Sequence, residues 1–91
     1  MEFEWNPRKA ESNWKKHGVS FAEAAEAFLD ENAVELFDDS NSSDEIRYQL
    51  VGISNLRLLF VAYTEREQTI RIISARKANA KQISIYNEQN G

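Results

Sequence analysis

The pattern of hydrophobic and polar positions changes once along the chain, from helical spacing to alternation. Apolar residues in the first third recur three and four positions apart, which favours helices, whereas residues 33–75 largely alternate, which favours strands. A short alternating segment, residues 2–5, precedes the helical region. A final helix is expected to begin at Lys77 or Asn79. The predicted order is therefore strand, two helices, four strands and one helix.

Local signals fix the ends of the first two helices. Asn6 followed by proline predicts the start of a helix that should run to about Lys16. Gly18 predicts its end, because glycine favours the left-handed conformation found there. Ser20 and Glu23 have the spacing of a capping box, which predicts the start of the second helix.

Both predicted helices have an apolar face that should pack on the strands. Ala10 and Trp14 lie four residues apart, with Asn13 beside them, and should form the inner stripe of the first helix. We assign both tryptophans, Trp5 and Trp14, to the core. The second helix has an apolar face that consists mainly of small residues: Phe21, Ala24, Ala25, Phe28 and Leu29.

Four strands are predicted at residues 33–37, 45–51, 56–64 and 69–75. The connections at 52–55 and 65–68 are short, so these neighbours must be antiparallel, since a parallel pair needs a long crossover. A polar loop is expected between the first two, from Asp38 to Asp44. The predicted fold class is α+β: one domain, residues 1–91, in which helices cover one face of an antiparallel meander.

Composition excludes several classes of function. The chain of 91 residues, 42% of them hydrophobic, can bury one modest core. It has no cysteine, which excludes disulfides, thiolate nucleophiles and thiolate metal sites. Its apolar runs are too short for a signal peptide or a membrane span, so we expect a cytoplasmic protein without a membrane partner. The acidic residues Asp38, Asp39, Asp44 and Glu45 lack ligand spacing and are interpreted as solvated charge, so no metal or cofactor is expected.

Positive charge is concentrated near the end of an acidic chain. The segment from Arg57 to Lys81 holds six basic and two acidic residues, a net charge of +4, whereas the rest of the chain carries −8. RNA is the candidate ligand, because guanidinium groups match pairs of phosphate oxygens. The alternative is that arginines at strand ends only keep a sheet in solution.

Two long segments resemble the BrnT family of type II toxins: FEWNPRKAESNWKKHGVSFAEAAEAF and LLFVAYTEREQTIRIISARKANAKQISIY. KHGVSF, YTER and IRIISARKA, in this order and spacing, form the specific combination. The resemblance implies a RelE-like ribonuclease fold, RNA cleavage that arrests growth, and neutralisation by a BrnA-like antitoxin. It also implies that operator DNA is bound only through the antitoxin complex. Glu67 stands where the family usually has glycine, which predicts a different turn type.

Two functions follow from these observations. The first is a metal-independent endoribonuclease, in which basic residues hold the scissile phosphate and stabilise its developing charge. The second is a non-catalytic protein-binding module whose basic face docks an acidic partner segment.

The strongest candidates for catalysis are two arginines of the last predicted hairpin. Alternation places Arg71, Ile73 and Ala75 on one face and Arg76 on the other. Arg71 is set among isoleucines and is expected to lean inward, where an arginine is costly unless it is paired or used. Arg66 is expected in the turn, free to reach across the end of the sheet. We expect Arg57, at the far end of the preceding strand, to matter little for activity.

Further candidates have competing explanations. His17 could act as a general acid or base, but we favour a helix cap or a substrate contact. Glu65 could accept the proton of a ribose 2′-hydroxyl or simply balance neighbouring arginines. Four residues could contact RNA, with surface charge or core packing as the alternative: Arg76, Lys77, Lys16 and Tyr63.

Overall fold

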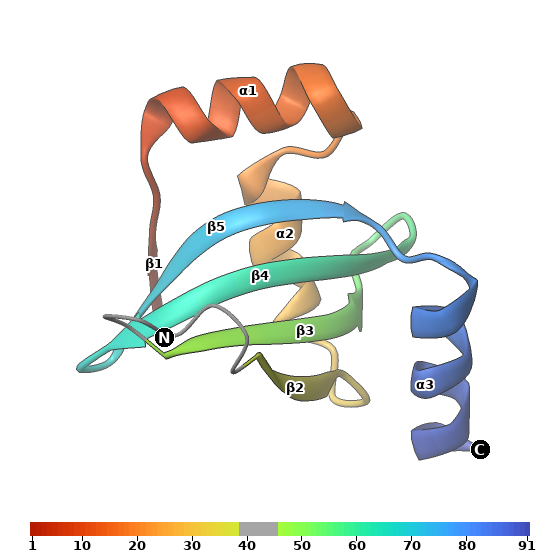
Figure 1. Ribbon diagram of the computed structural model, residues 1–91. Coiled ribbons are helices and arrows are strands. Elements are labelled where there is room, and N and C mark those ends of the chain that lie inside the picture. Colours follow the sequence, from red (N-terminus) through yellow and green to blue (C-terminus); the bar gives the residue numbers. More distant parts are fainter. Residues whose placement is uncertain (39–45) are drawn as a thin grey trace.

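The computed structural model describes residues 1–38 and 46–91, and its elements follow the predicted order (Figure 1). These elements are β1 (Glu2–Glu4), α1 (Pro7–His17), α2 (Phe21–Ala27), β2 (Val34–Asp38), β3 (Arg47–Ile53), β4 (Leu58–Arg66), β5 (Thr69–Lys77) and α3 (Ala80–Asn90). The α+β class is confirmed. The loop expected from Asp38 to Asp44 lies outside the described residues, apart from Asp38, which ends β2. None of the helices described is long and apolar enough to cross a membrane.

The five strands form one mixed sheet in the order β1-β5-β4-β3-β2. Strands β2 to β5 are an antiparallel meander, as predicted. Strand β1 adds to the meander by pairing in parallel with the start of β5, with Glu2 opposite Thr69 and Glu4 opposite Arg71. The first residues of the chain therefore reach the last hairpin.

Helix α2 packs on one face of the sheet and forms the main core there. Edge-to-face contacts tie the N-terminal segment to α2, with Trp5 against Phe21 at 6.0 Å and Phe3 against Phe28 at 5.2 Å between ring centroids. The buried members of this cluster are Val19, Phe21, Ala24, Ala27, Leu50, Leu59, Val61, Tyr63, Ile70, Ile72 and Ala75.

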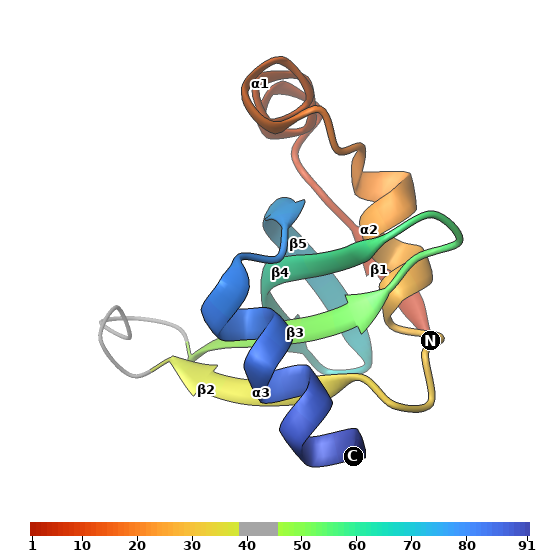
Figure 2. The same ribbon diagram turned by 90° about the vertical axis from the view of Figure 1, so that its right-hand side faces the viewer.

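Helix α3 packs against β2 and β3 on the other face of the sheet (Figure 2). Val51 and Tyr86 are buried but lie outside the α2 cluster, whereas Leu50 belongs to it. Adjacent strand residues point to opposite faces, so α2 and α3 cover different faces. The prediction that all helices cover one face was wrong, because the last apolar side chains of the chain cover the far side of β3.

Helix α1 covers the edge of β5 rather than a face. The buried Asn13 side chain makes the two hydrogen bonds that a neighbouring strand would otherwise make. Its Nδ2 donates to the Ala75 carbonyl at 2.8 Å, and its Oδ1 accepts from the Ala75 N–H at 3.1 Å. The edge N–H and carbonyl of Ala75, which β1 does not reach, are thereby satisfied. Trp14 is 58% exposed, so its assignment to the core was wrong. A helix over an edge buries a narrower stripe than a helix over a face.

A charged brace fastens the start of β4 to α2. Ser20 Oγ accepts from the Glu23 N–H at 3.0 Å, as the capping box requires, but the Glu23 carboxylate turns to Arg57 instead. Arg57 Nε and Nη2 donate to it at 2.9 and 2.8 Å, and Nη2 also donates to the Gly18 carbonyl at 2.9 Å. These hydrogen bonds from Arg57, with a further one from Ser54, hold the pKa of Glu23 below its ordinary value despite burial. Arg57 is therefore a structural residue.

The β4–β5 turn consists of Glu67 and Gln68, because Arg66 and Thr69 are paired. Glu67 has φ 57°, in the left-handed region that favours glycine. A side chain in this conformation costs roughly 1–2 kcal/mol. Glutamate at this position therefore leaves backbone strain in the turn.

We expect Glu67→Gly to raise the free energy of unfolding by about 0.5–1 kcal/mol, because relief of the strain exceeds the entropic cost of glycine. Urea denaturation measures the change. Gln68→Gly is the matched control and should lower stability, since the structure records no positive φ there. Equal losses in both variants would contradict this interpretation of the turn.

Candidate nucleic-acid interface

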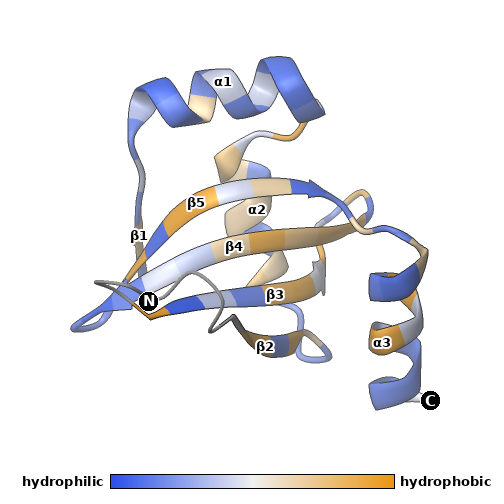
Figure 3. Cartoon of the chain, in the orientation of Figure 1, coloured by the Kyte–Doolittle hydropathy of each residue, from blue (hydrophilic) through white to orange (hydrophobic). Residues whose placement is uncertain are grey.

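The sheet face opposite α2, which we call the open face, carries a polar row across β1, β5, β4 and β3. Strand register places Arg47 opposite Thr64, Thr64 opposite Arg71, and Arg71 opposite Glu4. Residues directly opposite one another share a face. The row crosses the end of the sheet near the β4–β5 turn, where hydrophilic residues gather (Figure 3).

A β-bulge in β5 decides which arginines share the open face. Strand register leaves Ile73 without a partner on β4, so alternation shifts by one residue beyond this point. Ala75 consequently enters the core, and Arg76 joins Arg71 on the open face, where its guanidinium lies 4.7 Å from the centroid of the Phe60 ring. The prediction that Arg71 and Arg76 lie on opposite faces was wrong because unbroken alternation was assumed.

Arg71 lies at the rim and not inward as expected. Its Nη1 donates to Glu4 Oε2 at 2.7 Å, and the two side chains are 38% and 45% exposed. An ion pair this exposed contributes at most about 1 kcal/mol. An anionic ligand could therefore replace the Glu4 carboxylate at small cost.

The side chains of the last two residues of β4, Glu65 and Arg66, point to opposite faces of the sheet. Arg66 is the last residue of β4 and not part of the turn, and it is two residues from Thr64, so it shares the open face. Glu65 lies opposite the core residue Ile70, on the other face. The structure thus brings Arg66 and Arg71 together and separates Glu65 from them.

Arg47 also lies on the open face, and the sequence analysis missed it. It occupies the first position of β3, opposite Thr64. Its place in an alternating segment was visible in the sequence, but its neighbours depend on strand register. A register estimate for β3 and β4 was the signal that could have identified it.

Tyr63, expected to contact RNA, lies in the core instead. It is 2% exposed, stacks on Tyr48 at 5.6 Å and meets Phe28 edge to face at 4.9 Å. Burial, with the nearby Glu35 carboxylate, raises the pKa of Tyr63. No ring face is left on which a base could stack, so its role here is packing.

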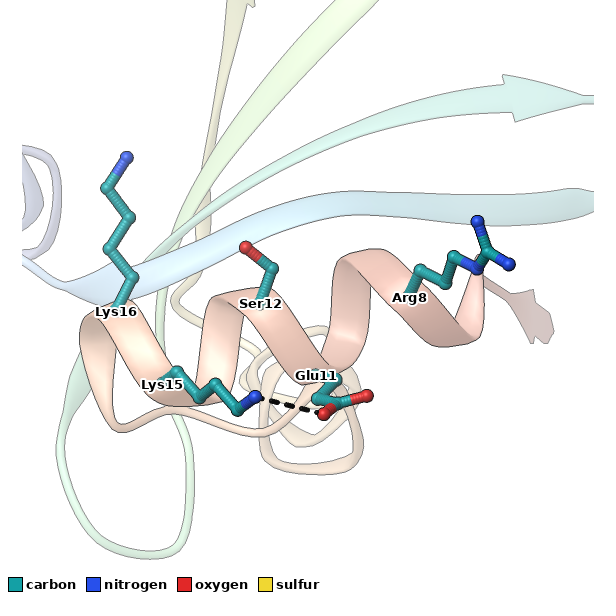
Figure 4. A pocket seen from close by; sticks show the side chains of 5 residues that line it. All are labelled: Arg8, Glu11, Ser12, Lys15 and Lys16. Carbon is teal, nitrogen blue, oxygen red and sulfur yellow. Dashed lines mark ion pairs between the residues drawn. The ribbon is translucent and has the colours of Figure 1, made fainter.

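Lys77 and Lys16 are exposed but do not join the open-face arginines. Lys77 ends β5 opposite Leu59, which belongs to the core on the other face. Lys16 lies on the outer side of α1, in line with Arg8 and Ser12, while Lys15 pairs with Glu11 at 3.1 Å (Figure 4). Such exposed pairs one helical turn apart contribute about 0.3–0.5 kcal/mol. This shallow surface has the character of a solvated helix face.

His17 lies near the opposite end of β4 from Arg66. It ends α1, and the carbonyl of the next residue, Gly18, accepts from Arg57, which directly precedes β4. Strand β4 has nine residues, on the order of 30 Å at about 3.3 Å per residue. His17 and Arg66 therefore cannot contact the same phosphate. The basic residues of the last turn of α1 suit a helix C-terminus.

Among the residues described, no three or more histidine, aspartate and glutamate side chains are grouped so as to hold a metal ion. The candidate site is a basic sheet face, because its arginines lie on the open face together. The residues it could use are Arg47, Thr64, Arg66, Arg71 and Arg76.

Comparison with known proteins gives one family. The family described as "Ribonuclease toxin, BrnT, of type II toxin-antitoxin system" matches residues 5–82, from just before α1 to the first turn of α3. No curated protein matches the chain. The match spans most of the chain, including the sheet that carries the arginines, and it confirms the resemblance noted from the sequence motifs. This chain therefore belongs to the BrnT family of ribonuclease toxins of type II toxin-antitoxin systems.

Proposed function

We propose that this protein is a metal-independent endoribonuclease with a RelE-like fold, which binds RNA on the open face of its sheet. The observation that carries the proposal is the grouping of three arginines on one face of a chain whose net charge is −4: Arg66 and Arg71 share this face by strand alternation, and the β5 bulge adds Arg76. Concentrating guanidinium groups on one face of an acidic protein favours a specific anionic ligand. Because the family consists of ribonuclease toxins, we propose that this anionic ligand is RNA.

In the proposed reaction the ribose 2′-oxygen attacks the adjacent phosphorus. The new 2′-O–P bond forms as the P–O5′ bond breaks, which leaves a 2′,3′-cyclic phosphate and a 5′-hydroxyl. The 2′-hydroxyl loses its proton to a base, and the leaving 5′-oxygen gains one. Negative charge on the phosphoryl oxygens is greater in the transition state than in the substrate. The arginines stabilise this extra charge, so they bind the transition state more tightly.

The two residues considered as alternatives for proton transfer, His17 and Glu65, do not lie on the open face. His17 is near the far end of β4, and Glu65 leaves the other face of the sheet. We therefore propose that positioning and charge stabilisation by arginine provide most of the acceleration.

Metal independence has a direct test. Purified protein incubated with total RNA in EDTA should cleave it as fast as in buffer with magnesium, because guanidinium groups replace a cation at the phosphate. Gel analysis of the RNA over time measures the rate. Activity that disappears in the chelator and returns with magnesium would rule this mechanism out.

Type II toxins bind a cognate antitoxin. We propose that a BrnA-like antitoxin covers the open face with an acidic segment, and that operator DNA is bound only through this complex. Excess antitoxin should then stop RNA cleavage in the same assay. A protein that binds the antitoxin and never cleaves RNA would support the alternative, a non-catalytic binding module.

A further inference from the structure

Thr64 is an unusual residue of the open face because its hydroxyl is buried without a partner. The residue is 5% exposed, and Oγ1 has no hydrogen bond to any of the residues described. Buried polar side-chain atoms in folded proteins are nearly always hydrogen-bonded, so an exception calls for a specific explanation. Threonine is not needed here for the strand, since valine has the same shape and equal strand preference.

The surroundings of Thr64 indicate what the missing partner is. Arg47 lies directly opposite it on β3, and Arg71 directly opposite on β5. Side chains opposite one another in a sheet have Cβ atoms about 4.5–5.5 Å apart, so both guanidinium groups can reach the space above Thr64. Two cations flanking an unused hydroxyl form an anion site.

We propose that Thr64 contacts the scissile phosphate, and that its hydroxyl donates a hydrogen bond to a non-bridging oxygen held between Arg47 and Arg71. This inference rests on the proposed function and names the residues that hold the phosphate. In the protein without RNA, Arg71 donates to the Glu4 carboxylate at 2.7 Å, on the β1 side of the strand, so Arg71 has to turn from Glu4 toward Thr64 when RNA binds.

The guanidinium groups on either side of Thr64 are accessible to a ligand, because the Arg71 side chain is 38% exposed and Arg47 is only partly buried. Binding as proposed requires Arg71 to turn from Glu4 toward Thr64, so that the hydroxyl can meet the phosphate.

Thr64→Val tests the proposal, because it removes the hydroxyl and keeps the shape. We expect unchanged or higher stability in urea, since no hydrogen bond within the protein is lost. RNA cleavage should fall roughly 100-fold in kcat/KM, at the lower end of the loss of about 10²–10³ for removal of one transition-state donor. Thr64→Ser, which keeps the hydroxyl, should retain most activity. Thr69→Val is the matched control at the start of β5 and should cleave normally.

A second readout uses inorganic phosphate and does not depend on catalysis. Amide NMR shifts on phosphate titration should concentrate at Arg47, Thr64 and Arg71 in the wild-type protein and weaken at least several-fold in Thr64→Val. Normal cleavage and normal phosphate binding by Thr64→Val would overturn the inference, as would a clear loss of stability, which would reveal a structural partner for the hydroxyl.

The two readouts separate this inference from the proposed function. If the wild-type protein cleaves RNA and Thr64→Val cleaves it equally well, the function stands and the role of Thr64 fails. If the wild-type protein leaves RNA intact but shows phosphate shifts that Thr64→Val loses, the anion site stands and the proposed function fails.

Discussion

Arg71→Ala should reduce RNA cleavage at least about 100-fold and leave the protein folded. The loss is large because this guanidinium binds charge that develops only in the transition state, so its removal lowers kcat. Arg71→Lys should also fail, since lysine keeps the charge but loses the two-pronged hydrogen-bonding geometry. Stability should fall by no more than about 1 kcal/mol, because the ion pair that Arg71 makes with Glu4 is exposed.

The matched control is Arg8→Ala, which changes the net charge equally at an exposed position of α1. Initial rates on a defined RNA, together with urea denaturation, give kcat, KM and stability for each variant. The control should cleave at the wild-type rate. Full activity of Arg71→Lys, or an equal loss in Arg8→Ala, would show that the arginines act only as diffuse charge.

Arg57→Ala should lower the free energy of unfolding by about 2–4 kcal/mol at neutral pH, somewhat less than the roughly 3–5 kcal/mol for removing one partner of a fully buried pair, because Arg57 is 30% exposed. The side chains of Arg57 and Glu23 are 30% and 11% exposed, so the Glu23 carboxylate would stay buried without its cation. From the sequence, Arg57 is expected to matter little for RNA cleavage, and this prediction concerns activity. It does not extend to the stability of the fold. Lys15→Ala, which breaks an exposed pair on α1, is the control and should cost less than about 0.5 kcal/mol.

The Glu23–Arg57 pair should also give stability a pH dependence. The pKa of Glu23 is lowered in the folded protein, chiefly by the hydrogen bonds from Arg57. Its contribution is therefore complete above the pKa of the unfolded chain and is lost as pH falls through the folded pKa. Urea denaturation from pH 7 to pH 3 should show a smaller loss for Arg57→Ala than for the wild type. If the free energy of unfolding of the two proteins changed equally with pH, the stabilising role of the Glu23–Arg57 pair would be contradicted.

Local sequence patterns were sufficient to predict the order of elements and the meander. Helix starts at Asn6 and Ser20 depend on nearby hydrogen bonds, and both appear as predicted. Short connections between strands also made antiparallel pairing unavoidable. The parallel pairing of β1 with β5 joins residues far apart in the chain, so no local pattern could show it.

The candidate site was predicted in part, by residue but not by arrangement. Arg66, Arg71 and Arg76 were identified, yet their faces could not be assigned, because one extra residue at Ile73 reverses the alternation beyond it. Arg47 was missed because its neighbours are set by register. Tyr63 was misplaced because an aromatic residue in an apolar strand can face either the core or a ligand.

The end groups of the RNA products give the most direct test of the central claim, which is metal-independent cleavage by the arginines of the open face. RNA incubated with the wild-type protein in EDTA should carry 2′,3′-cyclic phosphate and 5′-hydroxyl ends, detected by mass spectrometry. RNA incubated with Arg71→Ala should remain intact. Products with 5′-phosphate ends, or cyclic ends formed equally well by Arg71→Ala, would contradict the account.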